Sequence, residues 1–135
     1  MPNEFNDKII AEFRANNGVV GPPFAGAPMV LLTSTGARSA KPHTTPLVNY
    51  ADGDRVYVFA SMGGAPKHPA WYHNVVANPG VTVERGAEKY TAKARVLEGA
   101  ERDDIYARQA ALIPTFGDYQ QKTTRTIPVV ELIRS

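Results

Sequence analysis

The chain has 135 residues, 43% of them hydrophobic and 21% charged, which fits a single globular domain with its own core. It has no cysteine, which excludes a disulfide framework, thiolate catalysis and a cysteine-ligated metal or iron–sulfur centre. The net charge of +2 is too small to predict nucleic-acid binding, and no apolar run approaches the roughly 20 residues that span a bilayer. We therefore expect one domain over residues 1–135, a cytoplasmic location and no nucleic-acid partner.

Charge is distributed unevenly along the chain. Between Phe13 and Val83 the only acids are Asp52 and Asp54, both in a predicted turn. The same stretch contains five cations and all three histidines: Arg14, Arg38, Lys41, His43, Arg55, Lys67, His68 and His73. A local excess of positive charge favours a small anion, rather than a polyanionic surface, as the partner.

The N-terminal residues 2–17 have the pattern of an amphipathic helix, because Phe5, Ile9 and Phe13 recur every four residues. We expect this helix to cap the core. Its polar face is not strongly basic, which disfavours a membrane-surface role but leaves peripheral membrane contact open. Residues 19–28 are rich in Gly and Pro, which predicts a loop.

Six later segments have the composition of β-strands. Asp52–Gly53 and Gly86 mark turns between them, and Pro128 predicts that the last strand begins at a sheet edge. The predicted strands are residues 29–33, 44–50, 55–60, 81–84, 90–97 and 127–133.

Two segments, residues 68–77 and 99–112, are predicted helices, and residues 114–121 are a short segment containing aromatic residues. Strands and helices do not alternate as in a doubly wound sheet. The predicted fold class is therefore α+β, with an antiparallel barrel and short flanking helices.

Several motifs with known chemistry are absent from the chain. It has no G-x-G-x-x-G or Walker sequence, no H-E-x-x-H and no G-x-S-x-G, which disfavours dinucleotide, hydrolase and metalloenzyme functions. His68 and His73 are five residues apart, which would place them on different sides of a helix, so we expect no metal site.

Residues 33–46 have a composition typical of phosphate binding. Hydroxyl residues surround Gly36, and Arg38 and Lys41 add two cations, of which an arginine can hold a phosphate with two hydrogen bonds. The alternative is a solvated hairpin loop with ordinary surface charges. The absence of nearby acids favours an anion site over a solvated loop.

A second segment, residues 59–74, joins a Gly-Gly loop to a predicted helix that carries the only tryptophan, Trp71. The helix N-terminus would direct free amides towards residues 61–67. A tryptophan by itself is more often part of the core, but in this setting it could equally form the wall of a slot for a planar ring.

These segments resemble a known family. The sequences Thr-Ser-Thr-Gly-Ala-Arg-Ser-Ala-Lys (33–41), Gly-Gly-Ala-Pro-Lys-His-Pro-Ala-Trp-Tyr-His-Asn (63–74) and Ile-Pro-Val-Val (127–130) are similar to those of the deazaflavin-dependent nitroreductases. These proteins have a split β-barrel like that of flavin reductases and pyridoxamine-phosphate oxidases. The resemblance implies coenzyme F420, a 5-deazaflavin with a phosphate and an oligoglutamate tail.

The resemblance also implies which residues contact each partner. Ser61 and Tyr119 would contact the electron acceptor as the catalytic residues. Coenzyme-binding residues would be Ala37, Arg38, Ser39, Ala40, Lys41, Pro42, His43, Ala60, Ser61, Met62, Gly63, Gly64, Lys67, Ala70, Trp71, Tyr72, His73 and Asn74.

Three positions depart from the family pattern. His43 stands where a cation is common and Met62 where a lysine is frequent, so Arg38, Lys41 and Lys67 are left to neutralise the coenzyme. Phe116 stands where a further tyrosine is often found, which removes a hydroxyl proton donor and disfavours nitroimidazoles as acceptors.

The implied function is an F420H2-dependent reductase that passes a hydride to an electron-poor quinone, enone or nitro compound. Two alternatives remain open at this stage: a coenzyme-storage protein without turnover, and a barrel that binds FMN. A homodimer is a further expectation, because split barrels often dimerise.

Overall fold

The computed structural model of the chain describes residues 4–21 and 27–135. Residues 2–3 of the predicted N-terminal helix and residues 22–26 of the predicted loop lie outside these ranges.

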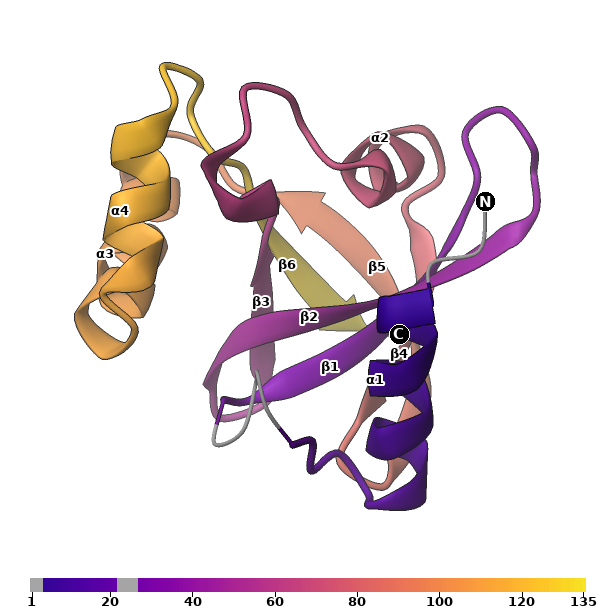
Figure 1. Ribbon diagram of the computed structural model, residues 1–135. Coiled ribbons are helices and arrows are strands. Elements are labelled where there is room, and N and C mark those ends of the chain that lie inside the picture. Colours follow the sequence, from indigo (N-terminus) through magenta and orange to yellow (C-terminus); the bar gives the residue numbers. More distant parts are fainter. Residues whose placement is uncertain (1–3, 22–26) are drawn as a thin grey trace.

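Six antiparallel strands close into a barrel in the order β1-β2-β3-β6-β5-β4 (Figure 1). Hairpins join β1 to β2, β2 to β3 and β4 to β5, and the barrel closes where β1 pairs with β4 and β6 pairs with both β3 and β5. The strands are β1 Met29–Thr35, β2 Pro42–Asp52, β3 Arg55–Phe59, β4 Gly80–Arg85, β5 Glu88–Val96 and β6 Val129–Arg134. The predicted α+β class with an antiparallel barrel is confirmed.

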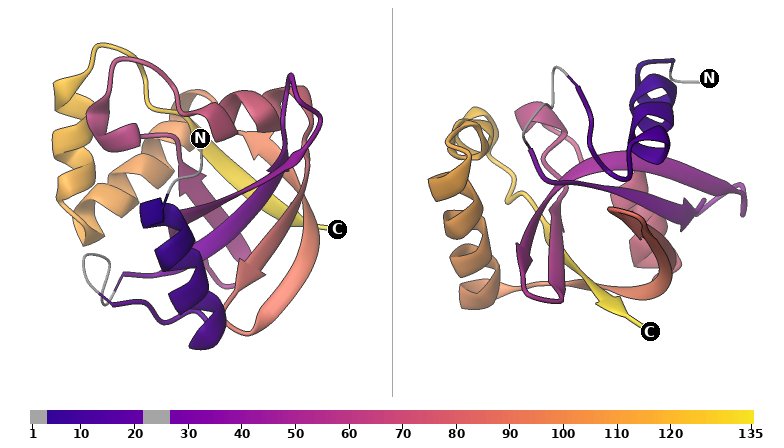
Figure 2. Two further views of the ribbon diagram at one scale, coloured as in Figure 1. Left: turned by 45° about the vertical axis from the view of Figure 1, so that its right-hand side comes forward. Right: turned by 90° about the horizontal axis from the view of Figure 1, so that it is seen from below.

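Helices cover the outside and one end of this barrel. The right-hand view of Figure 2 shows α1 against β1 and β2, with α3 and α4 on the opposite side. Within the described ranges the helices are α1 Glu4–Ala15, α2 Ala70–Ala77, α3 Gly99–Leu112, α4 Thr115–Lys122 and the short 3-10 helix η1 Met62–Gly64.

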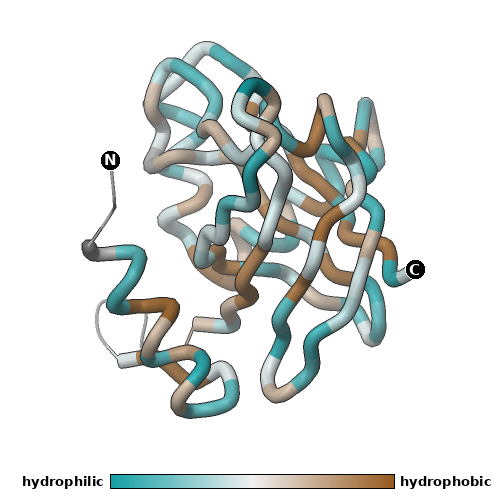
Figure 3. Tube along the Cα trace, turned by 90° about the vertical axis from the view of Figure 1, so that its right-hand side faces the viewer, coloured by the Kyte–Doolittle hydropathy of each residue, from teal (hydrophilic) through white to brown (hydrophobic). Residues whose placement is uncertain are grey.

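Several strands are buried on both faces, which explains their nearly continuous apolar sequences. Val30 and Leu32 of β1 point into the barrel core, whereas Leu31 packs outside against Ile9 and Phe13 of α1. Along the Cα trace, hydrophobic positions are concentrated on the strands and hydrophilic ones on many of the turns (Figure 3). Burial of these side chains is the main source of stability for a domain of this size.

The core extends beyond the strands at two places. Trp71 and Val75 of α2 belong to the barrel core, so α2 closes one end of the barrel. On the wall formed by β3, Phe59 packs edge-on against Tyr106 of α3 and Phe116 of α4, with ring centroids 5.8 and 5.4 Å apart. Phe59 and Phe116 of this second cluster also line a cavity.

Some local predictions were wrong. Pro128 does not mark a sheet edge, because a closed barrel has none: Pro128 precedes β6, and its carbonyl accepts a hydrogen bond from the amide of Ala60 at 3.0 Å. The first strand, predicted over residues 29–33, is longer, since β1 continues to Thr35. The second helix begins at Ala70 with Pro69 as its N-cap, so His68 precedes it.

Residues 115–122 form the helix α4, although their sequence suggested only a short aromatic segment. Packing of Phe116 against the barrel, rather than local propensity, accounts for this helix. Among the described residues, no helix combines the length and apolar composition needed to cross a bilayer.

Candidate functional site

The turn between β1 and β2 is held by its own backbone and by two side chains. The amide of Gly36 donates to the carbonyl of Lys41 at 2.8 Å, and the amide of Ala40 donates to the carbonyl of Gly36 at 3.0 Å. Ser39 Oγ lies 3.2 Å from His43 Nε2 and accepts from the Lys41 amide at 3.2 Å. The turn is therefore a defined structure and not a loose surface loop.

Helix α2 is fastened to this turn by two asparagines. Asn74 Oδ1 accepts from the amide of Ala37 at 3.0 Å, and Asn74 Nδ2 donates to Ser34 Oγ at 3.4 Å. One turn further on, Asn78 Nδ2 donates to the carbonyl of Thr35 at 3.4 Å. The cationic turn and the helix that carries Trp71 thus form one wall.

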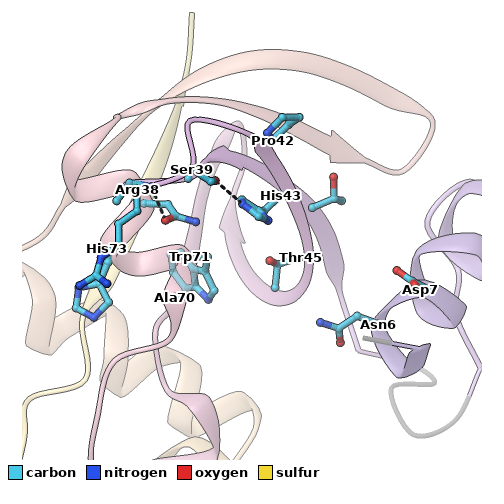
Figure 4. Close-up of a pocket in the computed structure, with 14 residues that line it drawn as sticks. Asn6, Asp7, Arg38, Ser39, Pro42, His43, Thr45, Ala70, Trp71 and His73 are labelled. Carbon is cyan, nitrogen blue, oxygen red and sulfur yellow. Dashed lines mark hydrogen bonds between the residues drawn. The ribbon is translucent and has the colours of Figure 1, made fainter. Parts of the chain in front are cut away.

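A cavity of about 1040 Å³ lies between this wall and α1. Arg38 and His73 lie on one side of it, and Asn6 and Asp7 of α1 lie on the other (Figure 4). Its lining comprises Asn6, Asp7, Gly36, Ala37, Arg38, Ser39, Pro42, His43, Thr44, Thr45, Ala70, Trp71, His73 and Asn74. Within the described chain Arg38 has no ion-pair partner, so its charge is available to an anion.

A second, more apolar cavity of about 600 Å³ adjoins the first. The two share Asn6, Thr45 and Trp71 as lining residues. The other residues of the second cavity are Ala27, Met29, Pro46, Leu47, Val48, Phe59, Ser61, Met62, Pro69, Ile113, Thr115, Phe116 and Tyr119. A polar, cation-bearing compartment is therefore adjacent to an apolar one.

Trp71 combines the two roles that its sequence context left open. It is 95% buried and packs in the barrel core, yet it lines both cavities. A tryptophan fixed in this way presents a rigid aromatic surface to a planar ligand at the boundary between the two compartments.

Ser61 reaches the second cavity from the end of β3. It is the N-cap of η1, and its carbonyl accepts from the amide of Gly64 at 2.9 Å. Met62 follows with φ of 46°, in the left-handed region that disfavours a side chain. Such a conformation needs support from surrounding contacts.

That support comes from Arg125, in the segment between α4 and β6. Its guanidinium donates to the carbonyls of Ala60, Ser61 and Ala65 at 3.1, 2.9 and 2.9 Å. It also donates to His68 Nδ1 at 3.0 Å. Nδ1 must therefore be unprotonated, since arginine has no acceptor.

His68 lies in an environment that disfavours its charged form. Burial, Arg125 and His73 lower the pKa of His68 below its ordinary value of 6.5. Its ring contacts that of Tyr72, with centroids 4.7 Å apart. His68 and His73 have ring centroids 5.9 Å apart, which the prediction of opposite helix faces did not anticipate. The described residues contain no group of three or more potential metal ligands.

Tyr119 and Phe116 bring α4 to the second cavity. Their rings pack edge-on with centroids 5.4 Å apart. The hydroxyl of Tyr106 donates to the carbonyl of Phe116, which holds this turn of α4 against α3. Burial raises the pKa of Tyr106 to about 12, so this hydroxyl stays protonated as a donor.

The structure separates the residues assigned from the sequence into two groups. Eleven line a cavity: Ala37, Arg38, Ser39, Pro42, His43, Ser61, Met62, Ala70, Trp71, His73 and Asn74, together with Tyr119 on the acceptor side. Six others lie outside both linings: Ala40, Lys41, Ala60, Gly64, Lys67 and Tyr72. Gly63 lies within η1.

Three of the six outer residues support the walls of the cavities. Ala60 is completely buried and offers its carbonyl to Arg125. Ala40 has φ of 58° and shapes the cationic turn, and Tyr72 packs on His68. Conversely, sequence patterns did not reveal Asn6, Asp7 or Arg125, since only long-range packing brings them to the site.

The class of protein follows from a closed antiparallel barrel with a cation-bearing cavity and an adjacent apolar cavity that share a buried tryptophan. The protein is a split β-barrel oxidoreductase. Residues 7–133 match the family model described as F420H(2)-dependent quinone reductase. The chain belongs to this family, whose members take coenzyme F420 as their cofactor.

Individual proteins agree with this assignment. The chain is 38% identical over 130 residues to an F420H(2)-dependent quinone reductase of Mycobacterium tuberculosis, which covers 92% of this chain and 86% of the relative. A solved F420-H2 dependent reductase, FDR-A, is 42% identical with a TM-score of 0.72, over 78% of this chain and 93% of the other. A solved domain-swapped dimer is 37% identical with a TM-score of 0.74, over 96% and 95%. The resemblance to deazaflavin-dependent reductases is confirmed, with quinone reductase as the family's description.

Proposed function

We propose that this chain binds reduced coenzyme F420 in the 1040 Å³ cavity and uses it to reduce a quinone held in the adjoining apolar cavity. The observation that carries this proposal is that the two compartments are adjacent and share Trp71, Thr45 and Asn6 as lining residues. A donor and an acceptor placed on either side of this boundary would lie in contact, as hydride transfer requires.

The residues of the larger cavity fit an anionic ring cofactor. Arg38, Ser39 and His43 supply a cation and polar donors at the turn, where we place the phosphate and the start of the acidic tail. Asp7 is the one acid among the described lining residues, and it belongs to α1 on the far side. Trp71 and Ala70 would border the ring.

The chain's own contribution to the reaction is positioning and protonation. When bound, a reduced deazaflavin supplies two electrons and a proton as a hydride. The quinone needs one further proton to become a hydroquinone, and we assign its delivery to the hydroxyls of Ser61 and Tyr119, which both line the acceptor cavity and would regain the proton from solvent once the hydroquinone leaves. The apolar walls around them would exclude water from the acceptor.

Two measurements test this function. Purified protein is titrated into F420 while the coenzyme's fluorescence is followed, and oxidation of F420H2 is then monitored with 1,4-benzoquinone and 1,4-naphthoquinone. We expect saturable binding at micromolar protein and quinone-dependent oxidation.

Absence of binding would refute the proposal, and binding without oxidation by any quinone, enone or nitro compound would favour a storage protein. Family membership does not favour the storage or FMN alternatives, and bound FMN would be visible as a yellow colour.

We also propose that the protein is a homodimer. Support comes from the 37% identical structure described as a domain-swapped dimer, which matches almost the whole chain. Light scattering after gel filtration should give twice the 14.7 kDa mass of one chain. The cytoplasmic location and peripheral membrane contact stay predictions.

A further inference from the structure

We propose that Arg125 is a positioning residue for the acceptor half of the site: it holds residues 61–65 in the conformation that directs Ser61 and Met62 into the apolar cavity. The inference rests on the proposed function for its kinetic consequence. Its structural part, the dependence of this loop on Arg125, stands on the contacts alone.

The contacts of Arg125 enclose the loop at both ends. Nη1 and Nη2 donate to the carbonyls of Ala60 and Ser61, where the loop leaves β3, and Nε donates to the carbonyl of Ala65, where it leaves η1. Three donors of one planar guanidinium thus fix three carbonyls that are up to five residues apart. A planar fork with donors in fixed directions suits this task better than the point charge of a lysine.

The loop needs an external clamp because its own hydrogen bonds are few. Within it, Gly64 donates to the Ser61 carbonyl at 2.9 Å and Ala65 donates to the Met62 carbonyl at 3.1 Å. Two residues of the loop have positive φ, Met62 at 46° and Gly64 at 83°. The left-handed conformation of the non-glycine residue Met62 is strained, and its surroundings must offset this strain.

Arg125 has no carboxylate partner in the described parts of the chain, in contrast to most of the other arginines. All of its described side-chain hydrogen bonds go to carbonyls of this loop and to His68. Because it is partly buried and lines neither cavity, it acts through the loop and not on the ligand directly.

Arg125 is itself held by α4, the helix that carries Tyr119. Gln120 Nε2 donates to the carbonyl of Arg125 at 2.8 Å, while Gln120 Oε1 accepts from Arg102 at 2.7 Å and from the amide of Ile127 at 3.0 Å. Ser61 and Tyr119, the two residues to which we assign proton delivery in the acceptor cavity, are therefore connected through Arg125 and Gln120. Their relative position depends on this chain of contacts.

The test compares Arg125→Ala and Arg125→Lys with the wild type and with Arg85→Ala. Arg85 is a matched control, because its guanidinium also bonds a backbone carbonyl, that of Gly53, at a turn outside both cavities. The first readout is amide hydrogen exchange of residues 61–66. Both Arg125 variants should exchange at least about 10-fold faster there, while residues 29–35 keep their protection in every variant.

The second readout is kinetic. In both Arg125 variants kcat for quinone reduction should fall about 10-fold or more, whereas the Kd for the coenzyme, whose cavity Arg125 does not touch, should change by less than about 3-fold. Arg125→Lys should recover only part of the loss, and Arg85→Ala should behave as the wild type.

The outcomes separate the two proposals. A wild type that does not reduce quinones would refute the proposed function, and the exchange data would still decide the role of Arg125. Wild-type exchange at residues 61–66 in folded Arg125→Lys would overturn the clamp, and wild-type kcat in that variant would overturn its role in positioning. If Arg125→Ala fails to fold, the lysine variant supplies both readouts.

Discussion

Asn74 Oδ1 accepts a hydrogen bond from the backbone amide of Ala37 at 3.0 Å, across 37 positions of sequence. This contact joins the cationic turn to the helix that carries Trp71. It fixes the two segments relative to each other, so that they form one wall of the larger cavity.

Replacing Asn74 with alanine should therefore loosen the wall. We expect a stability loss of about 1 kcal/mol, since two hydrogen bonds of a partly buried amide are lost, and weaker coenzyme binding by about 5- to 10-fold. Urea unfolding and F420 fluorescence titration measure the two effects. Asn78→Ala is the control: its amide also ties α2 to β1 but lines neither cavity, so it should reduce stability and leave affinity unchanged.

Arg38 and the two nearby lysines should differ in their effect on coenzyme affinity. Arg38→Ala should weaken binding by about 10- to 100-fold, the equivalent of about 1.5 to 3 kcal/mol for a charge-assisted bond. Lys41 and Lys67 lie outside the cavity lining, so their alanine variants should lose less than about 3-fold. Fluorescence titration at fixed ionic strength ranks the three variants. Equal losses would show that the anion lies over the outside of the turn.

Gly64 should tolerate alanine worse than Gly53, although both have positive φ. At Gly53, with φ of 62°, an added Cβ meets nothing within 4 Å, so we expect a cost of about 1 to 2 kcal/mol from the backbone alone. At Gly64, with φ of 83°, the Cβ would lie 2.8 Å from the carbonyl oxygen of Tyr119. Adding this overlap raises the expected cost to about 2 to 4 kcal/mol.

Denaturant unfolding of both glycine variants gives the difference. Because the overlap pushes η1 away from α4, Gly64→Ala should also lower quinone turnover, and Gly53→Ala should not. A similar loss of stability in the two variants would mean that η1 and α4 can separate without cost.

His68 should make stability depend on pH in the mildly acidic range. Its folded-state pKa is lowered by burial, by Arg125 and by His73, so the unfolded chain binds a proton more readily. The stability linked to neutral His68 is complete above about pH 6.5 and is lost as the pH falls from there towards the lower folded-state pKa.

Unfolding free energies measured from pH 8 to pH 5 test this dependence. His68→Asn keeps an oxygen where Nδ1 accepts from Arg125 but cannot take up a proton, so its stability should fall less steeply below pH 6.5. An unchanged slope in this variant would assign the dependence to other groups.

Much of the local structure follows directly from sequence patterns. Residues 99–112 form a helix with the predicted bounds, and the Asp52–Gly53 turn joins two strands as expected. These features depend on neighbouring residues: on helix-forming composition and on a glycine that accepts φ of 62°. The composition of residues 33–46 by itself likewise predicts an anion site.

Other features depend on contacts between distant segments. Closure of the barrel pairs β1 with β4 and β3 with β6, which leaves Pro128 without a sheet edge. The same closure brings Asn6 to the cavity boundary and Arg125 to a loop some 60 residues earlier in the chain.

Sequence alone thus determined the strands, the cationic turn and, through its resemblance, the coenzyme. Tertiary structure decided that Trp71 is both core and cavity wall, that Lys41 and Lys67 lie outside the lining, and that Arg125 bonds carbonyls at both ends of the loop after β3. Local propensity acts within a few residues, whereas these arrangements arise from burial of side chains contributed by every strand of a closed sheet.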